Sequence, residues 1–288
     1  MFEEEKCENK ISLMEYNCIN CNSKFLTNSN YDKCIFCNST NIEKKDTFVN
    51  DKIKVIPFNK EYSDVVKDYN KRIKFNPIVP RSFRNKNIFS TLQKVYVPVL
   101  VTNVSRTGEV EFVGGEKNKS NETNKYTVIQ SVRFNYNDVL FKMTSKIEDD
   151  TFNIINKYNL SNSIDINNNC FDDSFYLYED ISLNDISING KEDIDKHSIK
   201  IMKNKVNHSL KKLIRDNTNI LFENAKELLV PVFIMKVKYK DKDYTYIMNG
   251  ENGNSYINIP ISVTGIIILS LIVFVFVFLI SYLVAYFL

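Results

Sequence analysis

The strongest constraint on this chain is an apolar segment at its C-terminal end. From Ile266 to Leu288 the sequence runs for 23 residues without a charged side chain. At about 1.5 Å per residue, a helix of this length reaches roughly 34 Å, which is enough to cross the hydrocarbon core of a bilayer. A buried core helix is the alternative, but such helices are usually shorter and carry polar residues. The segment 261–288 is therefore predicted to be a transmembrane anchor.

The charges on either side of the body indicate how the anchor is oriented. The first ten residues are acidic and contain no apolar core, so we expect no signal peptide. Four lysines lie upstream of the apolar segment, and basic residues favour the cytoplasmic side of a span. They are Lys236, Lys238, Lys240 and Lys242. We expect a single-pass protein of the cell membrane with its N-terminal body in the cytoplasm and no domain beyond Leu288.

Near the other end of the chain, two Cys-x-x-Cys pairs stand twelve residues apart. They consist of Cys18, Cys21, Cys34 and Cys37. Four thiolates at this spacing satisfy the tetrahedral preference of Zn²⁺ and leave no open position for catalysis. Asn22 and Asn38 follow the pairs, at places where the backbone needs a positive φ that Asn tolerates well. The sequence predicts a structural zinc ribbon over residues 1–46, in a reducing compartment.

The composition of the ribbon does not favour a nucleic-acid reader. Its charged residues between Ile11 and Ile42 sum to zero and include no arginine, and the net charge of the whole chain is only +3. Four aromatic residues either cover its small core or form a protein-binding surface. They are Tyr16, Phe25, Tyr31 and Phe36. A redox role for the paired cysteines would need a different context and is the weaker alternative.

Residues 47–260 predict one α+β domain, joined to the ribbon by a charged link over residues 43–52. Apolar residues between Tyr62 and Ile73 stand at helical spacing and predict a helix, with Ser63–Asp64 available near its start and prolines after its end. Two similar Val-Pro-Val segments, Lys94–Val104 and Glu227–Val237, predict two related β-meanders. Their hairpin turns are expected at Gly108, Gly114–Gly115 and Asn249–Gly250. Between the meanders, an amphipathic helix is expected from Asp193 or Asp195 through Ile199 and Met202 to Leu213.

A basic stretch lies around the end of the first predicted helix. Between Lys67 and Lys86, seven Lys and Arg residues face one carboxylate, Asp68. Five of them are candidate binding residues, namely Lys71, Arg72, Lys74, Arg81 and Arg84. The stretch could bind anionic lipid headgroups or an acidic partner, form an ordinary solvated face, or oppose the acidic segment Asp172–Asp195.

The sequence contains no recognisable catalytic constellation. It has two histidines, His197 and His208, about three turns apart on one predicted helix. Cys170 stands among acidic residues, a setting that does not favour a reactive thiolate. Phosphate-binding loops and nucleophile motifs are missing from the sequence. We expect a protein that is not an enzyme and has no small-molecule substrate.

The order of several motifs resembles a family of membrane-anchored zinc-ribbon proteins of Firmicutes-type bacteria, whose ribbon is of the transcription-factor-B type. The motifs are CINC and CIFC, then KVIPF, NPIVPRSF, KVYVPVL, ELLVPVFIMKV and the hairpin YTYIMNGENG. Residues 116–195 match poorly, and Asn22, Asn38 and Phe233 replace Gly, Gly and Trp of several members. Some members are similar to the zinc-ribbon protein encoded beside phage-shock protein A and SPFH or virion-core-like proteins.

This resemblance implies a non-catalytic, tail-anchored adaptor that recruits a peripheral protein to the membrane in an envelope-stress response. The alternative is a membrane-tethered zinc-ribbon transcription regulator that binds nucleic acid through the ribbon and the basic stretch. A redox sensor is the third hypothesis.

Overall fold

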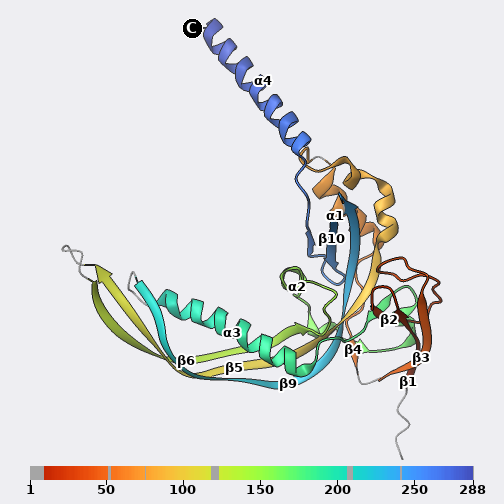
Figure 1. Cartoon of the computed structure of the whole chain (residues 1–288), viewed down its shortest axis with the longest axis vertical. Coiled ribbons are helices and arrows are strands. Elements are labelled where there is room, and N and C mark those ends of the chain that lie inside the picture. Colours follow the sequence, from red (N-terminus) through yellow and green to blue (C-terminus); the bar gives the residue numbers. More distant parts are fainter. Residues whose placement is uncertain are drawn as a thin grey trace, which may run out of the picture. The chain divides into compact units, whose positions relative to one another are not determined.

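The computed structural model describes residues 10–50, 53–74, 76–117, 123–205, 210–240 and 242–287, and it is a mixed α+β structure (Figure 1). The chain forms two compact units. Unit 1 comprises Met1–Val97, Ile147–Leu177 and Leu229–Leu288, and unit 2 comprises Pro98–Lys146 and Tyr178–Leu228. These units divide the chain differently from the boundaries predicted at residues 46 and 260, because the ribbon, part of the middle and the apolar helix share one unit.

Unit 1 is built on strands that are far apart in sequence. Its sheet order is β11-β10-β9-β5-β8-β2-β1-β3, with β4 and β7 paired off this path. The strands are β1 (Lys10–Cys18), β2 (Lys24–Thr27), β3 (Ile42–Asn50), β4 (Lys54–Val55), β7 (Ile164–Asp165), β8 (Phe175–Leu177), β10 (Lys242–Asn249), β11 (Ser255–Ile257), the start of β5 (Gln93–Lys117) and the end of β9 (Leu210–Tyr239). The ribbon is therefore continuous with the body of unit 1 through the β2–β8 and β8–β5 pairings.

The charged segment predicted as a link is strand β3, so that prediction was wrong. Each residue from Ile42 to Asn50 pairs with a residue of β1. β3 is the last strand of the sheet order, and most of its side chains are exposed. Charged residues are common on such edge strands because they prevent further strand pairing, which explains why the segment reads as a linker in sequence.

The first predicted helix is confirmed as α1 (Tyr62–Ile73). Its first turn is capped by the Asp64 carboxylate, which accepts a hydrogen bond from the Glu61 backbone amide at 3.0 Å. The buried side of α1 packs on residues of β9 and β10, including Phe233 and Tyr246. Unit 1 also contains α2 (Asp149–Ile155), α4 (Val263–Phe287) and the short 3₁₀ helices η1 (Arg81–Arg84), η2 (Lys86–Thr91), η3 (Leu160–Asn162) and η4 (Asn168–Phe171).

Unit 2 is a long sheet with one helix on one face. The part of β5 from Pro98 pairs antiparallel with β6 (Thr123–Lys142), and β9 lies on the other side of β5. Helix α3 (Leu183–Lys205) runs along these strands (Figure 1). Its apolar side chains Ile194 and Met202 enter two clusters with residues of the sheet.

Helix α3 differs from the predicted helix at both ends. It begins at Leu183, ten residues before Asp193. The prediction missed this first part because it is mostly polar and carries few periodic apolar residues. Its described part ends at Lys205, and Leu213 belongs to strand β9. Residues 206–209, which include His208, lie outside the described residues. Periodic apolar residues on a helix and on the following strand were mistaken for one pattern.

Two of the three predicted hairpin turns were wrong. Gly108 lies inside β5 opposite Val132, and Gly114–Gly115 lies in the same strand opposite Tyr126 and Lys125. The segment EVEFVGG is therefore a continuation of β5 and not a second strand. Only the turn at Asn249–Gly250 is confirmed, because β10 ends at Asn249 and a turn follows.

Gly108 lies where two neighbouring strands, β5 and β9, approach each other closely. It has a φ of +138°, and a Cβ atom there would lie 2.3 Å from the backbone oxygen of Asn217 on β9. Gly108→Ala is expected to destabilise unit 2 by about 2 kcal/mol or more, because it adds both backbone strain and a clash with an atom that cannot move alone. Chemical denaturation should show this loss, whereas Thr107→Ala at the exposed neighbouring position should leave the midpoint nearly unchanged.

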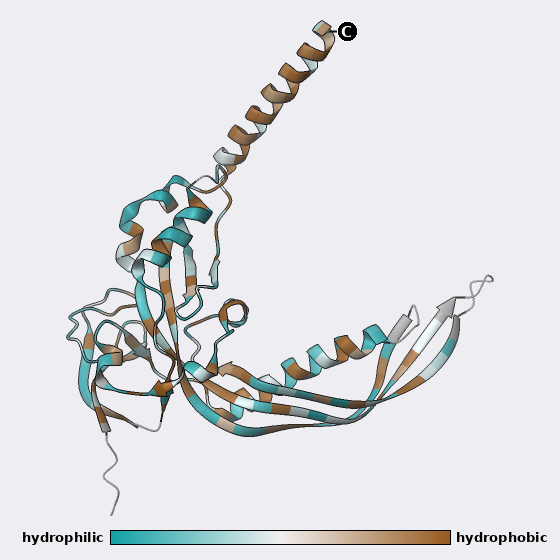
Figure 2. Cartoon of the chain, turned by 180° about the vertical axis from the view of Figure 1, so that it is seen from behind, coloured by the Kyte–Doolittle hydropathy of each residue, from teal (hydrophilic) through white to brown (hydrophobic). Residues whose placement is uncertain are grey.

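Helix α4 is long and apolar enough to cross a membrane. Its 25 residues are apolar along almost their whole length (Figure 2), and nearly all its side chains are exposed. A core helix of a soluble protein would be mostly buried, so this exposure agrees with a surface made for lipid.

Candidate metal centre

The four cysteines are presented by two knuckles of the same sequence pattern, Cys-Ile-x-Cys-Asn-Ser. In the first knuckle, the Asn22 amide donates to the Cys18 carbonyl at 2.8 Å, and the Cys18 amide donates to the Ser23 carbonyl at 3.0 Å. The same two hydrogen bonds close the second knuckle between Cys34 and Ser39, at 2.9 and 2.8 Å. The repeat in sequence is therefore a repeat in structure.

The asparagine that follows each pair has the predicted left-handed backbone. The φ angle is 53° at Asn22 and 58° at Asn38. Asn adopts this region more readily than other residues with a side chain, so it replaces the usual glycine with little strain. The sequence prediction for both positions is confirmed.

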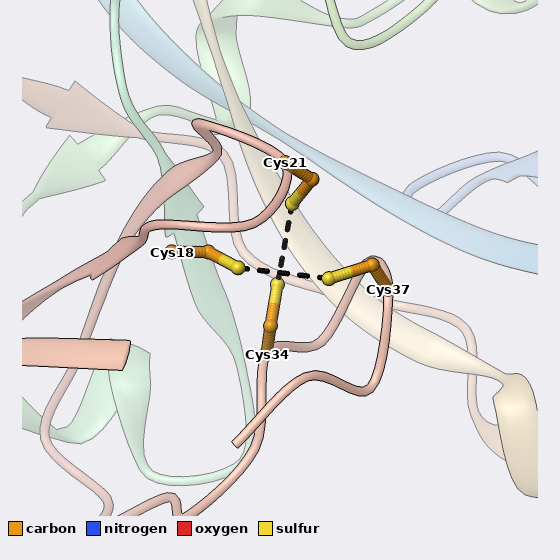
Figure 3. Close-up of side chains that lie close together, drawn as sticks. All are labelled: Cys18, Cys21, Cys34 and Cys37. Carbon is orange, nitrogen blue, oxygen red and sulfur yellow. Dashed lines mark hydrogen bonds between the residues drawn. The ribbon is translucent and has the colours of Figure 1, made fainter. Parts of the chain in front are cut away.

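The knuckles bring the four sulfur atoms together (Figure 3). The Sγ atoms of Cys18 and Cys37 lie 3.6 Å apart, and those of Cys21 and Cys34 lie 3.7 Å apart. All four lie within 4.8 Å of one another. A tetrahedral ion with metal–sulfur bonds of about 2.3 Å requires sulfur–sulfur distances of about 3.8 Å. The cluster can hold one metal ion.

Backbone amides donate to two of the sulfurs and favour their charged form, whereas burial opposes it at one of them. The Phe36 amide donates to the Cys34 Sγ at 3.4 Å, and a hydrogen bond from the Ser39 amide lowers the pKa of the Cys37 thiol to about 6. Burial raises the pKa of the Cys34 thiol to about 12. A metal ion binds thiolates, so it would have to displace the proton from this buried sulfur.

The ribbon's aromatic residues form its core. Tyr16 and Phe25 are fully buried and stack with ring centroids 5.0 Å apart. Tyr31 and Phe36 are half-buried, and Phe36 packs edge-on against Phe25 at 6.4 Å. The four residues therefore do not form an exposed binding surface, and the core alternative is the correct one for Tyr16 and Phe25.

The cysteine knuckles also contact the rest of unit 1 directly. The Gln93 side chain on β5 donates to the Ile35 carbonyl in the second knuckle at 2.6 Å. The ammonium group of Lys236 on β9 lies 5.7 Å from the centre of the Phe36 ring. A change at the cysteines should therefore be transmitted to the sheet of unit 1.

The five basic candidates are all exposed and lie near one end of α1. Lys71 and Arg72 are in its last turn, Lys74 is the residue after it, and Arg81 and Arg84 are in η1. Arg72 forms an ion pair with Asp68 at 3.0 Å and donates to the Ser255 hydroxyl at 2.7 Å. Arg84 donates to the backbone carbonyl of Asn76 at 2.7 Å.

The acidic segment finds its partners elsewhere. Asp180 accepts hydrogen bonds from the amide and hydroxyl of Ser145, both at 2.6 Å. Asp195 forms an ion pair with Arg106 at 3.0 Å. These contacts do not support the alternative in which the acidic segment neutralises the basic stretch.

The structure contains a further feature that the sequence did not indicate. A cavity of about 480 Å³ in unit 1 is lined by residues that include Phe58, Lys94, Tyr96 and Cys170. None of the four clustered cysteines lines it.

His197 lies on α3, where its ring is 6.0 Å from that of Tyr136.

No family model matches this chain, and neither does any curated protein or solved structure.

Proposed function

We propose that this chain is a non-catalytic adaptor, anchored in the membrane by α4, that holds a peripheral protein at the cytoplasmic face. Zinc bound by the four cysteines keeps the adaptor folded. The observation that carries the proposal is that a closed four-sulfur site and an apolar, exposed helix belong to the same unit. Such a combination suits a protein that is held at a membrane and binds another protein, rather than an enzyme.

The choice of zinc follows from the donor atoms. Four thiolates in a compact tetrahedral arrangement select soft or borderline ions, of which Zn²⁺ is the commonest in Cys-x-x-Cys knuckles. The amide hydrogen bonds to sulfur at Phe36 and Ser39 are the outer contacts that such a site uses to hold its ligands. A closed set of four protein ligands supplies no vacant position for substrate.

The resemblance to membrane-anchored zinc-ribbon proteins suggests the kind of partner. A scaffold of the phage-shock or SPFH type, which binds to membranes from the cytoplasmic side, is the partner that this resemblance favours. The lysines Lys236 and Lys238, near the C-terminal end of β9, agree with a body on that side.

Purification of the full chain from membranes tests the proposal. We expect one zinc per chain, a copurifying peripheral scaffold, and loss of that scaffold from the membrane in the Cys34→Ser variant but not in Cys170→Ser. An N-terminal tag should be cleaved by protease in inverted vesicles and protected in right-side-out vesicles.

Two results would contradict the adaptor. One is a scaffold that stays on the membrane when Cys34 is replaced. The other is salt-sensitive binding of DNA by the full chain in detergent, which would favour the transcription regulator instead.

A further inference from the structure

The start of the apolar helix is fixed to the body by a loop. The Ser262 amide donates to the Ile78 carbonyl at 2.8 Å, just before α4 begins. One turn later, a Cβ atom on Gly265 would lie 2.3 Å from the Pro77 carbonyl oxygen and 2.9 Å from the Ile78 Cα. Only glycine permits this approach, so the loop Asn76–Val79 lies against the first turn of α4.

Basic side chains flank this loop on both sides. Lys71 and Lys74 precede it at the end of α1, and Arg81 follows it at the start of η1. All three are exposed. The Arg84 guanidinium donates a hydrogen bond to the Asn76 carbonyl, so it also lies at the loop that contacts α4.

The length of α4 allows the loop to lie at the depth of the lipid headgroups. Twenty-five residues form a helix of about 37 Å, whereas the hydrocarbon core is about 30 Å thick. The excess corresponds to about one turn, which has to lie in the headgroup layer. If that is the first turn, the loop Asn76–Val79 lies in the same layer.

The residues beside the first turn are suited to this layer. Ile261 and Val263 are 65% and 69% exposed, and Pro77 is exposed beside them. Apolar side chains next to Lys and Arg are typical of segments that lie in a membrane interface. Arginine in particular binds phosphate through two parallel hydrogen bonds.

We propose that Lys71, Lys74 and Arg81 form a binding site for the phosphate groups of anionic lipids, positioned by the loop Asn76–Val79. This inference rests on the proposed membrane anchoring by α4. It explains why the cationic side chains gather at the base of the anchor, where a negatively charged membrane surface attracts them. A soluble acidic protein would have to compete with the bilayer for the same position.

Amide hydrogen exchange on the full chain in lipid nanodiscs tests this site. One set of discs contains phosphatidylcholine alone and the other contains phosphatidylglycerol as well. We expect the amides of Lys71–Lys74 and Arg81–Arg84 to exchange at least about fivefold more slowly in the anionic discs at low salt, and the difference to disappear at high salt.

A matched pair of variants separates the site from general charge. In Lys71→Gln/Lys74→Gln/Arg81→Gln the difference between discs should vanish. The control Lys125→Gln/Arg133→Gln/Lys226→Gln removes the same charge from exposed positions of unit 2 and should retain it. Arg72 is left unchanged because it forms an ion pair with Asp68, and Arg84 is left unchanged because it donates a hydrogen bond to the loop.

The outcomes distinguish the two proposals. Failure of the chain to enter either kind of disc would overturn the anchoring and the lipid site together. Entry into both with equal exchange would overturn the lipid site alone and assign the basic residues to a soluble acidic partner. Loss of the difference in both variants would show that overall charge, and not this site, is responsible.

Discussion

Replacing Cys34 by serine is expected to remove the proposed zinc ion and to lower the free energy of unfolding of unit 1 by at least about 4 kcal/mol. Cys34 is buried, its sulfur lies 3.7 Å from that of Cys21, and it belongs to the second knuckle. A serine hydroxyl is a poor ligand for zinc, so three thiolates would remain around an open position.

The effect should reach beyond the ribbon, because the ribbon is part of the sheet. Strand β2 pairs with β8 through Phe25 and Leu26, and β8 pairs with β5. If the metal is lost, the knuckles lose their closure and this edge of the sheet loses its support. Hydrogen exchange should therefore rise in β1, β2 and β8, as well as in the knuckles.

Metal analysis and thermal unfolding of the full chain in detergent measure this prediction. Zinc content should fall from about one per chain to nearly none, and a chelator added to the unmodified protein should reproduce the loss of stability. Cys170→Ser is the control because Cys170 lies outside the cluster. Full stability of Cys34→Ser without metal would contradict a structural role for the site.

The features that the sequence predicted correctly are those determined by nearby residues. The knuckle geometry depends on six consecutive residues, and the φ angles of Asn22 and Asn38 follow from the turn itself. The existence of helix α1 was predicted, because its apolar period and the prolines after it are both local signals. The apolar helix α4 belongs to the same class.

The features that could not be predicted from the sequence depend on residues far apart in the chain. Gly108 reads as a turn residue, and only the backbone of Asn217 beside it explains why it is glycine within a strand. Strand β3 reads as a linker until its pairing with β1 is known. The environment of Arg106 could not be predicted either, because its partners come from residues 195–218.

Arg106 is the largest fully buried side chain in the described part of the protein, and it joins three elements of unit 2. From β5, its guanidinium forms ion pairs with Asp195 on α3 and Asp216 on β9. It also donates to the hydroxyl of Thr218 on β9 at 2.9 Å and to that of Ser198 on α3. The network fixes how α3 lies on the sheet.

Removing both carboxylates is expected to be more damaging than removing the arginine. In Asp195→Ala/Asp216→Ala the guanidinium stays charged and buried without a counter-charge, which costs about 3–5 kcal/mol. In Arg106→Met the carboxylates that remain are 43% and 29% exposed, so water can solvate them. We expect a loss of about 1–3 kcal/mol in that case, since part of the interaction is already screened by solvent.

Denaturation of the full chain in detergent, followed through the exchange of α3 amides, measures both variants. The triple variant Arg106→Met/Asp195→Ala/Asp216→Ala should be more stable than Asp195→Ala/Asp216→Ala, because it removes the buried charge together with its partners. Glu192→Ala breaks the exposed pair with Lys196 at 2.7 Å on the same helix and should leave α3 unchanged.

The order of the two stabilities decides what the network does. If Arg106→Met proves the more damaging change, the side chain of Arg106 acts mainly by filling space under α3, and its charge is secondary. If the double carboxylate variant is worse, the charge itself requires Asp195 and Asp216 to stay together. Because these two residues lie on α3 and β9, a buried arginine then selects one position of the helix on the sheet, which apolar packing alone specifies less strictly.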